Sequence, residues 1–93
     1  MPYVYILICA DGSLYVGQTR NLQERLASHN AGTGAQHTRE RRPVRLAYAE
    51  AYETAQQATR RERQIKGWSR AKKLALIEGN TAHLKRLSKA RRK

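Results

Sequence analysis

Five polar side chains fall where the surrounding sequence pattern predicts inward-facing positions. They are two tyrosines, an arginine, a histidine and a glutamate: Tyr5, Tyr15, Arg25, His29 and Glu62. Each alone has a structural explanation, because strand tyrosines often pack in cores and an arginine can pair with a glutamate. Charged groups are costly to bury, however, so a set of them on inward faces suggests a function.

Together the five groups provide what cleavage of a phosphodiester bond requires. A carboxylate can hold Mg²⁺, which keeps several waters and often uses only one or two protein carboxylates. An arginine offers fixed, paired donors to a phosphate. A tyrosinate or a neutral imidazole can accept a proton from water, and nearby cations lower the pKa of a phenol.

The two tyrosines belong to an expected β-hairpin. Two apolar runs, Tyr3–Cys9 and Leu14–Gly17, are separated by a turn that contains Asp11-Gly12. Short β-prone runs around such a dipeptide are typical of hairpin strands. The first run is apolar on both faces, which favours a central strand covered on both sides.

The turn decides which faces the tyrosines share. A three-residue loop with Gly12 in the left-handed conformation pairs Leu7 with Tyr15 and places Tyr5 opposite Gly17. A two-residue loop would put the tyrosines on opposite faces, because a one-residue slip reverses every side chain. We favour the first register, which leaves open space at Gly17 beside the Tyr5 ring.

A helix is expected after the hairpin. Asn21 is a good N-cap with Glu24 three residues later, and Gly32 follows the last expected turn near Asn30. Helical spacing gives one inward stripe, formed by Leu22, Arg25, Leu26 and His29. We therefore expect Arg25 and His29 to face the tyrosines.

The middle of the chain is expected to hold a loop and a third strand. Residues 31–42 are polar and glycine-containing, which predicts a mobile loop. A strand is predicted over Val44–Tyr52, with Val44, Leu46 and Tyr48 on one face.

A second helix is predicted from the Thr54 N-cap to Lys66, before Gly67. Its apolar stripe is Ala55, Ala58 and Ile65. Glu62 lies about 40° from Ala58 around the helix. This places an acid on the inward side of a basic helix, and we expect it to converge on the tyrosine face.

Further helices are predicted from Ser69 to about Gly79, with Ala71, Leu74, Ala75 and Ile77 inward, and over Thr81–Leu87. The remaining residues, 88–93, read as a frayed basic tail. We accordingly predict one domain over residues 1–88 and a tail over 89–93. The predicted fold class is α+β, a three-stranded antiparallel sheet flanked by helices.

Charge points to a polyanionic partner. The net charge is +12, made of +2 in residues 1–50 and +10 in residues 51–93. Nucleic acid fits this charge. A membrane surface does not, because the C-terminal stretches lack a large aromatic-rich apolar face. Cys9 is the single cysteine, so no disulfide within the chain is possible. No secretory signal is recognised, and the cytoplasm is the expected compartment.

Three stretches resemble the GIY-YIG nucleases, most closely their small stand-alone bacterial members. They are Val4-Tyr5 with Tyr15-Val16-Gly17-Gln18-Thr19, then Asn21-Leu22 through Arg25-Leu26 to His29-Asn30, and Arg61-Glu62 through Lys66-Gly67-Trp68-Ser69-Arg70. The resemblance covers most of the chain to about Ile77. It implies a three-stranded antiparallel sheet flanked by helices.

The resemblance also implies roles. Tyr5 and Tyr15 would be the signature tyrosines, one of them the general base or the group that positions the nucleophile. Arg25 would hold the scissile phosphate, and His29 would assist proton transfer. Glu62 would be the sole protein ligand of one Mg²⁺ (or Mn²⁺) ion.

Contacts to the substrate are expected at Gly17, His37, Lys66 and Arg70. Two positions depart from the family pattern. The first half-motif reads Tyr3-Val4-Tyr5 and lacks its glycine. Larger members place an asparagine after the metal-binding helix, and only Asn80 could correspond.

The sequence therefore predicts a metal-dependent endonuclease that hydrolyses DNA, in DNA repair or recombination. The alternatives are a non-catalytic DNA- or RNA-binding module that keeps the fold, and a ribosome- or RNA-associated basic protein that depends on the tail. No specificity domain is recognised, so a homodimer or a protein partner is a further expectation.

Overall fold

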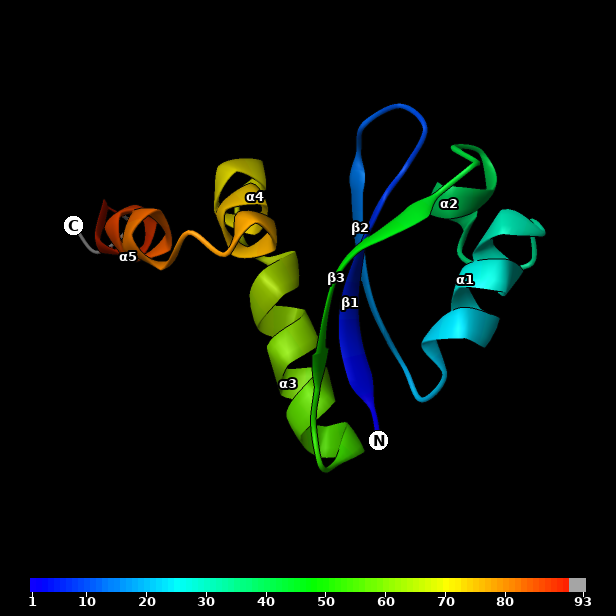
Figure 1. Ribbon diagram of the computed structural model, residues 1–93, viewed down its shortest axis with the longest axis horizontal. Coiled ribbons are helices and arrows are strands. Elements are labelled where there is room, and N and C mark those ends of the chain that lie inside the picture. Colours follow the sequence, from blue (N-terminus) through cyan, green and yellow to red (C-terminus); the bar gives the residue numbers. More distant parts are fainter. Residues whose placement is uncertain (91–93) are drawn as a thin grey trace.

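The computed structural model describes residues 1–90, and residues 91–93 lie outside that range. A three-stranded antiparallel sheet with the strand order β2-β1-β3 forms the centre. Helices α1 and α2 lie on one side of the sheet and α3 on the other, with α4 and α5 extending beyond α3 (Figure 1). The elements are β1 (Tyr3–Ile8), β2 (Leu14–Thr19), α1 (Leu22–Asn30), α2 (Gln36–Arg39), β3 (Arg45–Ala51), α3 (Ala55–Lys66), α4 (Arg70–Glu78) and α5 (Thr81–Ala90). The predicted α+β fold is confirmed.

The hairpin has the predicted register. Leu7 pairs with Tyr15, and Tyr5 with Gly17. The amide of Gly12 donates to the carbonyl of Cys9 at 2.9 Å, and Gly12 has a φ of 84°. A left-handed residue at this position is the mark of the three-residue loop, so the two-residue alternative is excluded.

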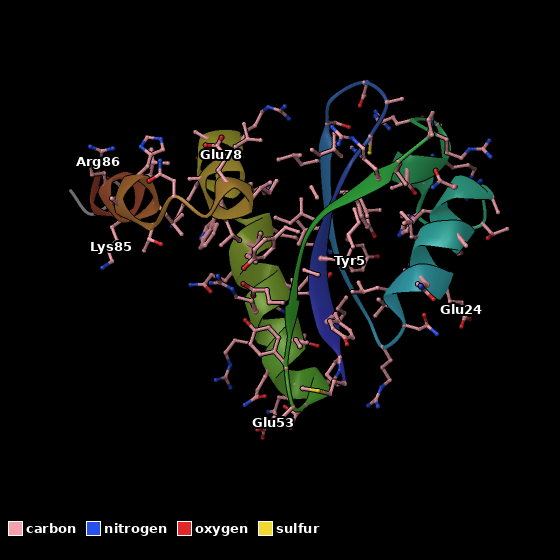
Figure 2. All side chains as sticks on the ribbon, viewed as in Figure 1. Tyr5, Glu24, Glu53, Glu78, Lys85 and Arg86 are labelled. Atoms are coloured by element: carbon pink, nitrogen blue, oxygen red, sulfur yellow. The ribbon has the colours of Figure 1, made fainter. Side chains whose placement is uncertain are left out.

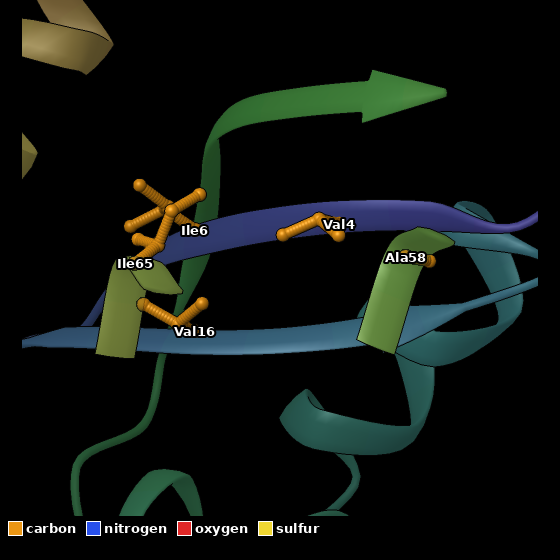
Figure 3. Packing of buried hydrophobic residues seen from close by; sticks show 5 residues of the cluster. All are labelled: Val4, Ile6, Val16, Ala58 and Ile65. Atoms are coloured by element: carbon orange, nitrogen blue, oxygen red, sulfur yellow. The ribbon is translucent and has the colours of Figure 1, made fainter. Parts of the chain in front are cut away.

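One face of the sheet packs against α3 through aliphatic side chains. The cluster consists of Val4, Ile6 and Val16 from the sheet with Ala58 and Ile65 from α3 (Figure 3). Ala58 and Ile65 confirm two members of the predicted stripe. Ala55 is exposed, because it lies in the first turn of α3, so its predicted burial is wrong.

The opposite face packs against α1. Its buried residues are Tyr5, Leu7, Cys9 and Val44, with Leu22 and Leu26 of α1 packed against them. Asn21 caps α1 by accepting the amide of Glu24 at 3.0 Å. Central strand β1 is therefore covered on both faces, as its apolar composition predicts.

Strand β3 contains an irregularity that the alternation pattern missed. Leu46 pairs with Leu7 and Tyr48 pairs with Ile6, so Ala47 is an extra residue between them. Such a bulge changes the facing of every residue that follows it. Leu46 consequently lies on the Tyr5 side while Tyr48 packs toward α3, and the prediction that they share a face is wrong.

The segment predicted as a loop, residues 31–42, contains helix α2 with the fully buried Thr38. Asn30 joins the end of α1 to the residue before β3 by two hydrogen bonds. Its amide donates to the carbonyl of Val44 at 3.0 Å, and its side-chain oxygen accepts the amide of Val44 at 2.8 Å. The segment between these anchors is thus held against the Tyr5 face.

The C-terminal half forms α4 and α5, as predicted in outline. The inward residues of α4 are Lys72 and Ala75, with Leu76 and Ile77 packed on the α3 cluster, whereas Ala71 is exposed. Helix α5 continues to Ala90, beyond its predicted end at Leu87. The rest of the predicted tail, residues 91–93, lies outside the described residues, and the domain limits stay a prediction. No helix among residues 1–90 combines the length and apolarity needed to cross a bilayer.

Candidate active site

The two tyrosines and His29 form one ring cluster on the α1 face. The ring centroids of Tyr5 and Tyr15 are 6.4 Å apart, and the imidazole meets both edge-on, at 6.0 and 5.2 Å. Tyr5 lies between the sheet and α1 (Figure 2). The hairpin register therefore brings both tyrosines to the inward stripe of α1, as predicted.

The Tyr5 hydroxyl lies at the centre of this cluster. It is 3.0 Å from Nε2 of His29, and Nε of Arg25 donates to it at 3.4 Å. Tyr5 is 1% exposed and His29 is fully buried, whereas Arg25 is half-buried. A phenol is thus placed between an imidazole and a guanidinium, with the guanidinium nearest to solvent.

Gly17 permits this position of the phenol. A Cβ atom at Gly17 would lie 2.6 Å from the hydroxyl oxygen of Tyr5 and 3.1 Å from the ring of Tyr15. Any side chain there would displace the hydroxyl. The space beside Gly17 is filled by Tyr5 itself, so the prediction of open space is wrong, and a substrate contact at Gly17 stays a prediction.

Burial sets the protonation of the two central groups. It raises the pKa of Tyr5, and the hydrogen bond from Arg25 offsets only part of that increase. Burial also lowers the pKa of His29, and the positive charge of Arg25 lowers it further. Tyr5 therefore keeps its proton near neutral pH, while His29 is neutral and has a free lone pair to accept one.

The other side of the His29 imidazole contacts helix α2. Nδ1 lies 2.7 Å from Oγ1 of Thr38, and that hydroxyl donates to the carbonyl of Ala35 at 2.9 Å. The sequence reasoning missed Thr38, because a threonine in a polar, glycine-containing segment carries no signal of burial.

His37 lies on the outer side of Tyr15. The two rings are stacked, with centroids 6.0 Å apart and an interplanar angle of 29°. Nε2 of His37 is also 3.0 Å from Oγ of Ser13, which donates to Asp11 at 2.6 Å. The structure thus ties His37 to the hairpin turn, and its predicted phosphate contact stays a prediction.

Glu62 approaches the site from the opposite side of the sheet. Its carboxylate accepts a hydrogen bond from the side-chain amide of Gln18 on β2 at 2.9 Å. It also forms an ion pair with the ammonium group of Lys66 at 2.7 Å. Among the described residues, no hydrogen bond joins it to the tyrosine cluster. Its charge still contributes to raising the pKa of Tyr5. The prediction that Glu62 lies on the tyrosine face is wrong, because α3 covers the other face and Glu62 lies at its β2 edge. Joint action of Glu62 and Tyr5 on one phosphate stays a prediction.

Gln18 is a site residue that the sequence reasoning also missed. Its side-chain amide donates to both Thr59 and Glu62, at 2.8 and 2.9 Å. The two-residue period of a strand provides the signal that would have found it. Gln18 follows Gly17 directly, so it must point to the face opposite the tyrosines, where α3 lies.

A second polar network fixes α3 against β3. Arg61 donates to Glu50 through Nε at 2.8 Å and through an Nη group at 3.3 Å, and the hydroxyls of Tyr48 and Tyr52 donate to the same carboxylate. Arg61 directly precedes Glu62 in α3. This two-point contact therefore sets the rotation of the helix that carries Glu62.

Glu62 is chemically suited to a hard divalent cation. Its side chain is 15% exposed. No group of three or more His, Cys, Asp or Glu side chains within residues 1–90 could hold a metal together. A single carboxylate suits Mg²⁺ or Mn²⁺ ions that keep most of their waters. Lys66 would have to leave the carboxylate oxygen, and its side chain is 51% exposed and has room to do so.

The remaining predicted residues lie near the ends of helices. Arg70 is the first residue of α4 and is exposed. Asn80 accepts the amide of His83 at 3.1 Å and so caps the start of α5. Asn80 therefore has a structural role as a helix cap. Among the described residues, no hydrogen bond joins Arg70 or Asn80 to the tyrosine cluster.

Comparison with known proteins places this geometry in a family. The profile of the GIY-YIG catalytic domain matches residues 1–75. A UPF0213 protein of Bacillus pumilus is 53% identical over 76 residues, which cover 82% of this chain and 78% of the relative. UPF0213 protein SH2523 of Staphylococcus haemolyticus is also 53% identical, with 82% and 93% covered.

Two solution NMR structures share the fold. UPF0213 protein BH0048 of Bacillus halodurans has a TM-score of 0.55 and 43% identity, with 84% of each chain covered. Protein EF2693 of E. faecalis has a TM-score of 0.58 and 40% identity, with 88% of this chain and 85% of that chain covered. With the profile match and the paired tyrosines, these likenesses show that the chain belongs to the GIY-YIG family of nuclease domains.

Proposed function

We propose that this protein is a divalent-metal-dependent endonuclease that hydrolyses phosphodiester bonds in DNA. The observation that carries the proposal is the placement of the Tyr5 hydroxyl, 3.0 Å from His29 and 3.4 Å from Arg25. A phenol between a neutral imidazole and a guanidinium can pass a proton inward while the guanidinium binds a phosphate.

The proton path follows from these contacts. The attacking water gives a proton to the Tyr5 oxygen as the Tyr5 proton moves to Nε2 of His29. The water oxygen forms a bond to phosphorus, and one ester P–O bond breaks. The leaving oxygen departs with the bonding electrons and takes a proton from solvent. Tyr5 is the preferred acceptor because its hydroxyl contacts the His29 imidazole, which can take up the proton, whereas the partner given for the Tyr15 side chain is the Arg25 guanidinium, which can only donate.

Arg25 controls access to Tyr5. Tyr5 is almost fully buried, so water reaches its hydroxyl only when the overlying region opens. The 3.4 Å contact from Arg25 is long for a hydrogen bond, so a phosphate would compete well with Tyr5 for the guanidinium. Binding of the scissile phosphate would thus uncover the group that accepts the proton.

Glu62 would hold one Mg²⁺ or Mn²⁺ ion at the β2 edge. When bound, such an ion would stabilise negative charge on the phosphate and on the leaving oxygen. Gln18 holds the carboxylate at that edge by its hydrogen bond, so the chain fixes the ligand without the ion.

The basic half of the chain would bind the DNA backbone. Residues 51–93, which include α3, α4 and α5, carry a net charge of +10. Lys85 and Arg86 project from α5 into solvent (Figure 2). Such contacts give affinity without sequence specificity. A second copy or a partner protein would then supply specificity, and repair or recombination in the cytoplasm is the setting we propose.

A nicking assay on supercoiled plasmid with Mg²⁺ tests the proposal. Glu62→Gln and Arg25→Gln should each lower the rate by about 10²-fold or more. Glu53→Gln, at an exposed position before α3, is the matched control and should cut like wild type. Equal nicking by wild type and Glu62→Gln would refute metal-dependent hydrolysis. Flap, junction and duplex substrates, with RNA as a further arm, would define the substrate class.

One observation favours a second candidate, a nucleic-acid-binding module without cleavage. Both oxygens of Glu62 already have partners, Gln18 and Lys66, as in a purely structural carboxylate. This candidate predicts salt-sensitive DNA binding that persists in Glu62→Gln, together with the absence of Mg²⁺-dependent nicking by wild type.

A further inference from the structure

We propose that Thr38 is a positioning residue that fixes the tautomer of His29, and thereby makes Tyr5 the donor in the Tyr5–His29 hydrogen bond. The inference rests on the proposed function for its catalytic meaning. Its structural part, the order of donors and acceptors, stands on the contacts of helix α2.

A series of hydrogen bonds runs from Ala35 through Thr38 and His29 to Tyr5, and the carbonyl of Ala35 fixes which group donates in each. The carbonyl oxygen of Ala35 lies 2.9 Å from the Thr38 hydroxyl and can only accept. A threonine hydroxyl has one proton, which is therefore committed to Ala35. At 2.7 Å, the Thr38 oxygen must then accept from Nδ1 of His29, so Nδ1 carries a proton.

The order then passes to Tyr5. A neutral imidazole with its proton on Nδ1 has a lone pair on Nε2. Nε2 lies 3.0 Å from the Tyr5 hydroxyl, so Tyr5 must donate to it. Nε of Arg25, which can only donate, meets the remaining lone pairs of the same oxygen at 3.4 Å. Every contact along this path has one donor and one acceptor.

The opposite tautomer would break the path. With its proton on Nε2, His29 would donate to Tyr5, and its Nδ1 would face a Thr38 oxygen that has no proton left to give. Tyr5 would then have no acceptor for its own proton among the groups that contact it. Proton transfer from water through Tyr5 to His29 therefore needs the order that Thr38 imposes.

Burial and packing hold the arrangement. Thr38 and His29 are both fully buried, so water does not compete for these contacts. Gly34 brings the chain against the imidazole, since a Cβ atom there would lie 2.4 Å from Nδ1. The charged group that faces His29 is Arg25, and the other titratable groups nearby are Tyr5 and Tyr15, with His37 stacked on Tyr15.

Nitrogen NMR of histidine-labelled protein tests the order directly. In wild type, at a pH where His29 is neutral, we expect a protonated Nδ1 and an unprotonated Nε2. Thr38→Val has a similar shape and lacks the hydroxyl, so the Nε2-protonated form should increase. Thr38→Ser restores the hydroxyl and should return the wild-type spectrum. A wild-type imidazole protonated on Nε2 would overturn the inference, even if Thr38→Val does not fold.

Plasmid nicking tests the catalytic meaning. Thr38→Val should lower the single-turnover rate by about tenfold or more with an unchanged affinity for DNA, and Thr38→Ser should recover most of the rate. A changed tautomer with an unchanged nicking rate and pH profile would overturn the positioning role.

The two readouts separate the possible failures. A tautomer that depends on Thr38 in a protein that does not nick would refute the proposed endonuclease while leaving the hydrogen-bond order intact. If the protein nicks DNA but the His29 tautomer is unchanged in Thr38→Val, the inference is refuted and the proposed endonuclease activity stands.

Discussion

The two faces of the central sheet are built by alternate residues of the same strand, and they differ in kind. Val4 and Ile6 face α3 in an aliphatic cluster (Figure 3), whereas Tyr5 faces α1 among hydrogen-bonding groups. His29 and Thr38 on that side are polar and fully buried. No buried side-chain polar atom within the described residues lacks a hydrogen-bond partner.

The difference separates two tasks. The α3 face stabilises through area removed from water, which tolerates changes of shape as long as volume is kept. The α1 face depends on the direction of each hydrogen bond, so a single lost atom leaves a buried group unpaired. Mutation of adjacent residues of β1 should therefore affect different properties, mainly the nicking rate on one face and only the stability on the other.

Substitution at Tyr5 and Ile6 should show the largest contrast. Tyr5→Phe removes the hydroxyl and should lower nicking by about 10²-fold or more, at a cost of about 1–3 kcal/mol in stability for the unpaired imidazole. Ile6→Ala should cost about 2–5 kcal/mol and leave the rate per folded molecule unchanged. Urea unfolding and single-turnover nicking measure both. A similar loss of rate in Ile6→Ala would contradict the separation of the faces.

Glycine replacements should separate the faces by the sign of the stability change. Gly34→Ala forces a Cβ to within 2.4 Å of Nδ1 of His29 and should cost about 1–3 kcal/mol. Gly67→Ala, at the end of α3, is the control. Its backbone φ is −80° and its Cβ would meet the nearest atom at 3.6 Å, so it should stabilise by about 0.4–1 kcal/mol. If Gly67→Ala destabilised the protein and Gly34→Ala did not, the close packing would be assigned to the end of α3 and not to His29.

The buried imidazole should make the α1 face sensitive to acid. Since burial lowers the pKa of His29, the unfolded chain takes up a proton below its usual value of 6.5 while the folded chain does not. The free energy of unfolding should therefore fall as the pH falls below about 6.5, down to the lowered pKa of the folded state. Denaturant unfolding at several pH values should show a weaker dependence in His29→Gln than in wild type. His83→Gln, on α5, should keep the wild-type dependence, and an unchanged slope in His29→Gln would disprove the effect.

The smallest effect is expected at Lys66. Its ion pair with Glu62 competes with a divalent cation, and a half-exposed pair is worth up to about 1 kcal/mol. Lys66→Met should tighten Mn²⁺ binding by up to about fivefold, measured by titration without DNA. Lys85→Met on exposed α5 is the control. Weaker Mn²⁺ binding in Lys66→Met would contradict this competition and show that Lys66 favours binding of the ion.

Sequence reasoning predicted the features that follow from local rules. The Asp11-Gly12 turn set the register, and helical spacing brought Arg25 and His29 to the tyrosines, because both rules depend on a few neighbouring residues. The bulge at Ala47 and the burial of Thr38 were missed. Each depends on contacts between segments distant in the sequence, which neither the alternation within a strand nor the composition of a loop reports.

The position of Glu62 shows a related limit. Its inward direction on α3 was predicted correctly, but the sheet face that α3 covers is decided by the chain's path after β3. Periodicity within a helix contains no information about that path. The same applies to the ion pair between Arg61 of α3 and Glu50 of β3, which depends on where α3 packs.

The sole tryptophan of the chain, Trp68, gives the molecule an optical reporter of its own. Arg61 and Lys72 lie 5.1 and 4.2 Å from the centre of its ring, at the junction of α3 and α4. Its fluorescence should respond when a nearby positive charge moves, whereas the tyrosines on the other face emit separately. Trp68 fluorescence, excited at a wavelength that tyrosine does not absorb, would thus report the binding of a polyanion to the basic helices in the unmodified chain. The signal would not depend on whether the polyanion is cut.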